Sequence, residues 1–78
     1  MYYVYILKCV DDKSYTGCTD NLKERIERHK NGYVPAIKER RPLKLDMYFA
    51  IQDKHKAFNF EKHLKSGSGR AFIKKHFT

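Results

Sequence analysis

Residues 2–9 read Tyr-Tyr-Val-Tyr-Ile-Leu-Lys-Cys and residues 14–19 read Ser-Tyr-Thr-Gly-Cys-Thr, and these two stretches decide the fold. Both are rich in the aromatic and β-branched side chains that favour strands. Between them, Asp11-Asp12-Lys13 is a turn signal, because aspartate side chains can hydrogen-bond the backbone of a turn. The sequence therefore predicts a β-hairpin at the start of the chain.

A helix is expected directly after this hairpin. Asp20 or Asn21 can cap its first turn, and Asn21 and Glu24 have the spacing of a capping box, in which two side chains satisfy backbone N–H groups. The helix should end near residues 31–32, which read Asn-Gly, because glycine commonly terminates helices. Residues 33–42 are basic and contain two prolines, so we expect an irregular segment there.

The remainder of the chain predicts one more strand and two more helices. Residues 43–51 alternate as a third strand, with four apolar side chains expected on one side of it: Leu43, Leu45, Met47 and Phe49. Asp53 opens a second helix that runs to about Lys65, and a Ser-Gly-Ser-Gly stretch at 66–69 separates it from a short C-terminal helix. The order ββαβαα predicts an α+β fold, in which helices flank a small three-stranded antiparallel sheet, with residues 1–78 as a single domain.

The chain is strongly basic, with 17 Lys and Arg against nine Asp and Glu and a formal net charge of +8. A soluble cationic surface is the simplest explanation. A charge this high on so short a chain nevertheless favours a polyanionic partner, and nucleic acid is the commonest one. From residue 54 onward Glu61 is the only acid. The candidate nucleic-acid-binding side chains are basic residues of the middle segment and of the last two helices: Lys38, Arg40, Arg41, Lys65, Arg70 and Lys74.

Several other classes of protein are disfavoured. No apolar stretch approaches the roughly 18–20 residues that a membrane span needs, and the apolar start of the chain lacks the basic lead-in of a signal peptide. We therefore expect a cytoplasmic location and two reduced cysteines, Cys9 and Cys18, rather than a disulfide. A zinc site is not expected, because the chain has no Cys-x-x-Cys motif and its His55 and His63 are eight residues apart.

The first helix places polar residues on its apolar face. At about 100° per residue, one stripe holds Leu22, Arg25, Ile26 and His29, so an arginine and a histidine face the body of the protein. Burying an arginine without a partner is costly, and an anion should meet it. The alternative is that only the aliphatic stem of Arg25 covers the edge of the core.

The second helix repeats this pattern with the opposite charge. One stripe holds Ala57, Phe60, Glu61 and Leu64, which places a carboxylate among core positions. An unpaired carboxylate there would destabilise the fold. Glu61 therefore either pairs with Arg25 in a structural salt bridge or binds a cation, since Mg²⁺ commonly uses one carboxylate together with water and phosphate oxygens. The sequence leaves both possibilities open.

The relative position of the tyrosines depends on the hairpin turn. If the loop has an odd number of residues, Tyr5, Tyr15 and Gly17 lie on one face of the sheet, because side chains alternate along each strand. If the loop has two residues, Tyr5 and Tyr15 lie on opposite faces. Tyrosine is also a frequent residue of strands, so packing alone could account for these positions.

Together these residues resemble the GIY-YIG nuclease superfamily, and most closely its small single-domain bacterial members. Tyr3-Val4-Tyr5 corresponds to the first triplet of the signature and Tyr15-Thr16-Gly17 to the second, with Tyr3 in place of the glycine and Thr16 in place of the second isoleucine. Further along, Arg25, His29 and Glu61 fall at the family's arginine, helix histidine and metal-binding glutamate.

The resemblance implies hydrolysis of phosphodiester bonds with one divalent ion, Mg²⁺ or Mn²⁺, and no other small-molecule cofactor. Glu61 would hold the ion, Arg25 would neutralise charge on the phosphate, and Tyr15 would position water or phosphate. Gly17 would allow a close approach to the backbone. Either Tyr5 or His29 would act as the base: His29 has the more suitable ordinary pKa, whereas the resemblance favours Tyr5.

Three hypotheses follow from the sequence. The first is a metal-dependent endonuclease that acts on DNA, including structured or damaged DNA, as a monomer or weak dimer. The second is a non-catalytic nucleic-acid-binding module that retains the nuclease fold. The third is a structural domain in which Arg25 and Glu61 simply pair.

Overall fold

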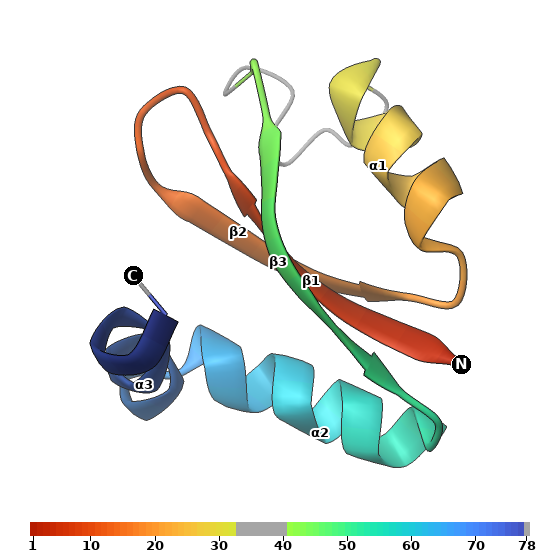
Figure 1. The fold of residues 1–78 in the computed structure, drawn as a ribbon, viewed down its shortest axis with the longest axis vertical. Helices are drawn as coiled ribbons and strands as arrows, with labels where there is room; N and C mark the ends of the chain where they lie inside the picture. Colours follow the sequence, from red (N-terminus) through yellow and green to blue (C-terminus); the bar gives the residue numbers. More distant parts are fainter. Residues whose placement is uncertain (33–40, 78) are drawn as a thin grey trace.

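The computed structural model describes residues 1–32 and 41–77, and Figure 1 shows its elements. They follow one another as β1 (Tyr2–Lys8), β2 (Ser14–Thr19), α1 (Leu22–Lys30), β3 (Lys44–Ile51), α2 (Lys54–Lys65) and α3 (Gly67–Phe77). The strands form one antiparallel sheet in the order β2-β1-β3. The predicted element order and the predicted three-stranded antiparallel sheet are both confirmed. Within the described residues, no helix combines the length and the apolar character needed to cross a bilayer.

The hairpin of β1 and β2 sets the face on which the tyrosines lie. Tyr5 pairs with Gly17 and Leu7 with Tyr15. The backbone N–H of Cys9 donates to the carbonyl of Lys13 at 2.9 Å, which leaves an odd-numbered turn over residues 10–12. Of the two registers open to the sequence, the structure has the one that brings Tyr5, Tyr15 and Gly17 to the same face.

Helices cover both faces of the sheet (Figure 1). On one face, Val4 and Ile6 of β1 are buried against Ala57 and Leu64 of α2 and Ile73 of α3. On the other face, the alternate β1 residues are buried together with apolar side chains of α1: Tyr5 and Leu7 with Leu22 and Ile26. The central strand is therefore buried on both sides. Full burial of a large apolar side chain contributes about 1.5–3 kcal/mol, so β1 organises both halves of the core.

The third strand differs from the prediction, which placed Leu43, Leu45, Met47 and Phe49 on one side. The β1–β3 register shifts between Ile6 and Leu7, where Met47 pairs with Ile6 but Leu45 pairs with Leu7. Asp46 is thus an extra residue on β3, and such a bulge reverses the face of the side chains beyond it. As a result, Leu43 and Leu45 pack on the α1 side, whereas Met47 and Phe49 pack on the α2 side.

Local side chains fix where the first two helices begin. The Asn21 side chain accepts the N–H of Glu24 at 3.2 Å, as the capping box predicts, but the Asn21 N–H donates to the Thr19 hydroxyl at 3.1 Å. Asp53 caps α2 by accepting the N–H of Lys56 at 2.9 Å, and this bond holds the pKa of its carboxyl below the ordinary value. Both caps satisfy N–H groups that have no partner inside the helix.

The break between α2 and α3 depends on Ser66 and Gly69. The Ser66 hydroxyl donates to the carbonyl of His63 and accepts the N–H of Gly69 at 3.2 Å. A Cβ at position 69 would lie 2.6 Å from the Cα of Leu64, so only glycine permits the two helices to approach this closely. This turn directs α3 back under the sheet, where Ile73 joins the core.

Candidate active site

The centre of the candidate site is a buried hydrogen bond between Tyr5 of β1 and His29 of α1. The Tyr5 hydroxyl lies 2.8 Å from Nε2 of His29, and each residue is only 1% exposed. Gly17, on the neighbouring strand, makes room for the tyrosine, since a Cβ there would lie 2.5 Å from Cζ of Tyr5. The atoms nearest to Gly17 thus belong to the Tyr5 ring, and the glycine serves the packing of that ring.

Tyr15 and Arg25 complete a group of four side chains. The rings of Tyr5 and Tyr15 both meet the His29 ring edge-on, with centroids 5.6 and 5.3 Å away. Arg25, one turn before His29, is close enough to the Tyr5 hydroxyl to act on it by hydrogen bonding and by charge. We call Tyr5, Tyr15, Arg25 and His29 the tyrosine–histidine cluster; the structure brings together all four residues that the sequence suggested.

The electrostatics keep the central pair neutral. Burial raises the pKa of Tyr5, and the guanidinium of Arg25 partly opposes this effect through a hydrogen bond and its charge. Burial also lowers the pKa of His29, with smaller contributions from the charges of Arg25 and Arg28. At neutral pH the pair is therefore a phenol and a neutral imidazole. Within the described residues, Nδ1 of His29 is a buried ring nitrogen without a hydrogen-bond partner.

Glu61 approaches the cluster from the other helix layer. Its side chain on α2 is 20% exposed, and its Oε2 atom lies 3.1 Å from Nζ of Lys65, one turn later. Burial is the main reason that the pKa of Tyr5 and of Cys18 is raised, and the charge of Glu61 adds to the effect in both cases. In the part of the chain that the structure describes, the ion pair of Glu61 is with Lys65, not with Arg25.

The donor set at Glu61 fits a weakly held divalent ion. No group of three or more metal-binding side chains occurs within residues 1–32 and 41–77. A single, partly exposed carboxylate oxygen suits Mg²⁺ or Mn²⁺, because such ions keep several waters and take further oxygens from a substrate phosphate. It does not suit zinc, which prefers several nitrogen or sulfur ligands.

A basic groove of about 900 Å³ lies between the turn end of the hairpin and helices α2 and α3. Five cationic side chains line it, and we use "basic groove" for the surface formed by Lys8, Lys13, Lys65, Arg70 and Lys74. Two carboxylates, Asp12 and Asp46, also line it, and Lys8 pairs with Asp12 at 3.7 Å. Tyr15 belongs to the wall of this groove as well as to the tyrosine–histidine cluster, so the two features adjoin.

Three of the six basic residues proposed from the sequence, Lys65, Arg70 and Lys74, come together in this groove. Arg41 does not belong to it; its guanidinium donates to the carbonyl of Lys30 at the end of α1. Lys38 and Arg40 lie outside the described residues. Lys8 and Lys13 were not proposed from the sequence as nucleic-acid-binding residues. Their place at the turn end of the hairpin follows from the strand register, which pairs Lys8 with Ser14.

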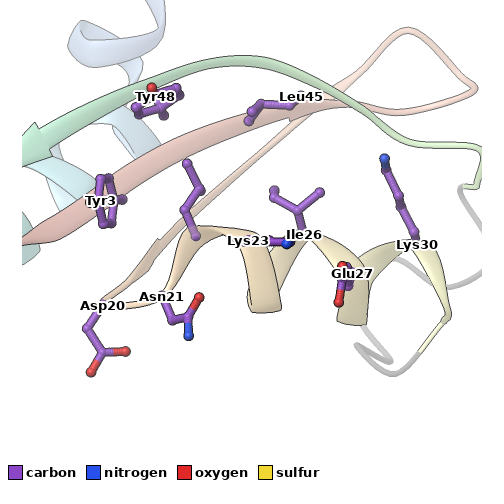
Figure 2. A pocket seen from close by; sticks show the side chains of 10 residues that line it. Tyr3, Asp20, Asn21, Lys23, Ile26, Glu27, Lys30, Leu45 and Tyr48 are labelled. Carbon is purple, nitrogen blue, oxygen red and sulfur yellow. The ribbon is translucent and has the colours of Figure 1, made fainter.

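A second groove, of about 600 Å³, lies between α1 and strands β1 and β3. Figure 2 shows Ile26 and Lys30 of α1 projecting towards Leu45 of β3, whereas Asp20 points away. Tyr48 is 52% exposed here and meets Tyr3 edge-on at 6.1 Å. The charges around it are balanced rather than basic, which distinguishes it from the basic groove.

Known proteins resemble this chain in sequence and in structure. The sequence matches the model of the GIY-YIG catalytic domain over residues 1–75. It is 36% identical over 76 residues to a UPF0213 protein of Pediococcus acidilactici, an alignment that covers 94% of this chain and 78% of the relative. A UPF0213 protein of Clostridium perfringens is 42% identical over 66 residues, which cover 83% and 71% of the two chains.

A solved structure is similar over nearly the whole chain. The solution NMR structure of a UPF0213 protein from Bacillus halodurans has a TM-score of 0.61 and 32% sequence identity, and the superposition covers 96% of this chain and 84% of that one.

Proposed function

Because this chain belongs to the GIY-YIG family, whose fold is a nuclease fold, we propose that it is a metal-dependent endonuclease that hydrolyses phosphodiester bonds in DNA, including structured or damaged DNA. The observation that carries the proposal is the buried 2.8 Å hydrogen bond between Tyr5 and His29, with Arg25 beside it. A hydroxyl aligned on a neutral imidazole is the arrangement that general-base catalysis requires.

In this proposal Tyr5 and His29 share the role of base. The proposal takes the tautomer of His29 in which Nε2 carries no proton, so that the Tyr5 hydroxyl donates to Nε2. Burial lowers the pKa of His29, which keeps the ring neutral at physiological pH. As a water oxygen bonds to phosphorus, the water gives a proton to the Tyr5 oxygen, and the Tyr5 proton passes to His29. The bond between phosphorus and the leaving oxygen breaks, and the leaving oxygen takes a proton from solvent. His29 later returns its proton to solvent, so one water is consumed for each bond cleaved.

Arg25 has two tasks. Its guanidinium lowers the pKa of Tyr5 against the effect of burial, which favours transient loss of the phenolic proton. It would also stabilise the additional negative charge on phosphorus in the transition state, a role in which one donor is commonly worth a factor of about 10²–10³ in rate. Tyr5 is buried in the free protein, so its hydroxyl must become accessible before a water reaches it.

The remaining residues bind and orient. Glu61 would hold one Mg²⁺ or Mn²⁺, which when bound supplies Lewis-acid polarisation of the scissile phosphate. Tyr15 joins the cluster to the basic groove, whose cations would follow the sugar–phosphate backbone and position a bond at the cluster. We retain a cytoplasmic location and a monomeric or weakly dimeric state as parts of this proposal.

A plasmid-nicking assay tests the proposal. The purified protein should nick supercoiled plasmid DNA in Mg²⁺ or Mn²⁺, and Arg25→Ala and Glu61→Gln should each reduce the rate by at least about 100-fold. Lys23→Ala is the matched control, because Lys23 is an exposed cation on the same helix and does not belong to the tyrosine–histidine cluster. Full nicking by the Arg25 or Glu61 variant would show that the roles are wrongly assigned.

The second candidate is a nucleic-acid-binding module without catalysis. It is favoured by one observation: five cations line the basic groove whether or not Glu61 holds a metal. It predicts binding whose affinity falls steeply with salt, because each phosphate contact releases counterions. No divalent ion would then support cleavage of DNA or RNA, and the same nicking assay separates the two candidates.

A further inference from the structure

Lys65 can neutralise either of two anions, the Glu61 carboxylate or a phosphate bound in the basic groove. In the structure its ammonium is 3.1 Å from Oε2 of Glu61, the proposed metal ligand. The Lys65 side chain is 51% exposed, and an exposed helical pair of this spacing is usually worth no more than about 1 kcal/mol. The contact is thus weak enough to be exchanged for another one.

The other anion would be a phosphate held in the basic groove. Lys65 lines it together with Arg70 and Lys74 of α3 and two lysines of the hairpin. Cations gathered on one surface repel one another, and a phosphate backbone in the groove would remove that repulsion. The same ammonium can therefore neutralise Glu61 or bind a phosphate, and a flexible lysine stem permits the change.

We propose that Lys65 is a positioning residue that occupies Glu61 in the metal-free protein and transfers to a substrate phosphate when nucleic acid enters the basic groove, which frees the Glu61 carboxylate for the divalent ion. The inference rests on the proposed function. By thermodynamic linkage the coupling is reciprocal: nucleic acid strengthens metal binding at Glu61, and metal strengthens nucleic-acid binding. The ion is then held firmly only when there is a strand to cleave.

The test measures Mn²⁺ affinity by the paramagnetic broadening of NMR signals around Glu61, with and without a phosphorothioate DNA oligonucleotide that resists cleavage. In the free protein, Lys65→Met should bind Mn²⁺ about threefold more tightly than the wild type, since the competing ion pair is gone. Lys56→Met removes an exposed charge from the same helix, at a position outside the basic groove, and should leave the free-protein affinity unchanged. With the oligonucleotide bound, the wild type and Lys65→Met should converge.

Two results would overturn the inference: equal or weaker Mn²⁺ binding by free Lys65→Met, or a difference between the two proteins that persists with the oligonucleotide bound. Failure of the proposed function looks different. In that case Glu61→Gln would bind Mn²⁺ as the wild type does, or the wild type would not nick DNA in any metal. Intact metal-dependent nicking without the Lys65 effect would refute the inference alone.

Discussion

Replacing Gly17 with alanine should disrupt the tyrosine–histidine cluster although Gly17 itself performs no chemistry. The new Cβ would lie 2.5 Å from Cζ of Tyr5, whereas carbon atoms in contact settle at about 3.5–4.0 Å. The Tyr5 ring must therefore move by about 1 Å. A shift of that size away from His29 stretches their 2.8 Å hydrogen bond beyond the usual range.

The energetic cost follows from these two effects. Overpacking of a core costs about 1–3 kcal/mol, and loss of a hydrogen bond costs about 1 kcal/mol more. A domain of this size loses about 4–8 °C of melting temperature per kcal/mol, so Gly17→Ala should melt roughly 10–30 °C below the wild type. Nicking should fall at least about 100-fold, because the shared base is no longer aligned.

Thermal denaturation by circular dichroism, with the nicking assay alongside, measures both effects. Gly67→Ala is the control, because no atom lies within 4 Å of a Cβ built at that position, and it should melt at or slightly above the wild-type temperature. The His29 pKa, followed by NMR, should rise towards its ordinary value in Gly17→Ala as the ring loses its packing. A variant that melts within a few degrees of the wild type and retains a lowered His29 pKa would refute the steric reasoning.

The other predictions concern the pH response, the tyrosine hydroxyl and the basic groove. The pKa of His29 is lower in the folded protein than its ordinary value of 6.5, so the unfolded chain binds a proton first as the pH falls. The contribution of His29 to the free energy of unfolding should therefore be full above about pH 6.5 and decline below it. The melting temperature of His29→Gln, measured against pH, should lack this decline. Tyr5→Phe should remain folded and bind DNA with unchanged affinity in a filter-binding assay, but its nicking rate should fall about 10²–10⁴-fold. A nicking rate equal to that of the wild type would exclude the Tyr5 hydroxyl from the reaction. Arg70→Gln should weaken DNA binding and reduce the slope of log affinity against log salt by about one, and an unchanged slope would remove Arg70 from the phosphate contacts.

Much of the site was predictable from the sequence because its signals are local. Helical periodicity alone placed Arg25 and His29 on the inner face of α1 and Glu61 on the inner face of α2, and the structure buries all three at least partly. The cap residues Asn21 and Asp53 act through bonds to residues three positions away, so short stretches of sequence suffice to identify them.

Other features depended on contacts between distant segments. The sequence could not choose between two hairpin registers, and it missed the bulge at Asp46, because both are settled by which residues of neighbouring strands pair. It left the partner of Glu61 open between Arg25 and a cation, whereas the structure pairs Glu61 with Lys65, one helix turn away. Glu61 and Lys65 are four residues apart, a spacing that permits an ion pair within one helix. Whether Glu61 pairs with Lys65 or with Arg25 depends on how α1 and α2 lie relative to each other on the sheet.

The sequence by itself determined the order of the elements, their inward faces and the family signature, since periodicity, caps and turn residues act over a few positions. Only the tertiary structure decided that Tyr5 bonds to His29, that the space at Gly17 is filled by the Tyr5 ring, and that cations of the hairpin and of α3 form one groove. Those arrangements join residues far apart in the chain. They are fixed by strand register and by the packing of helices on both faces of β1, which no local pattern specifies.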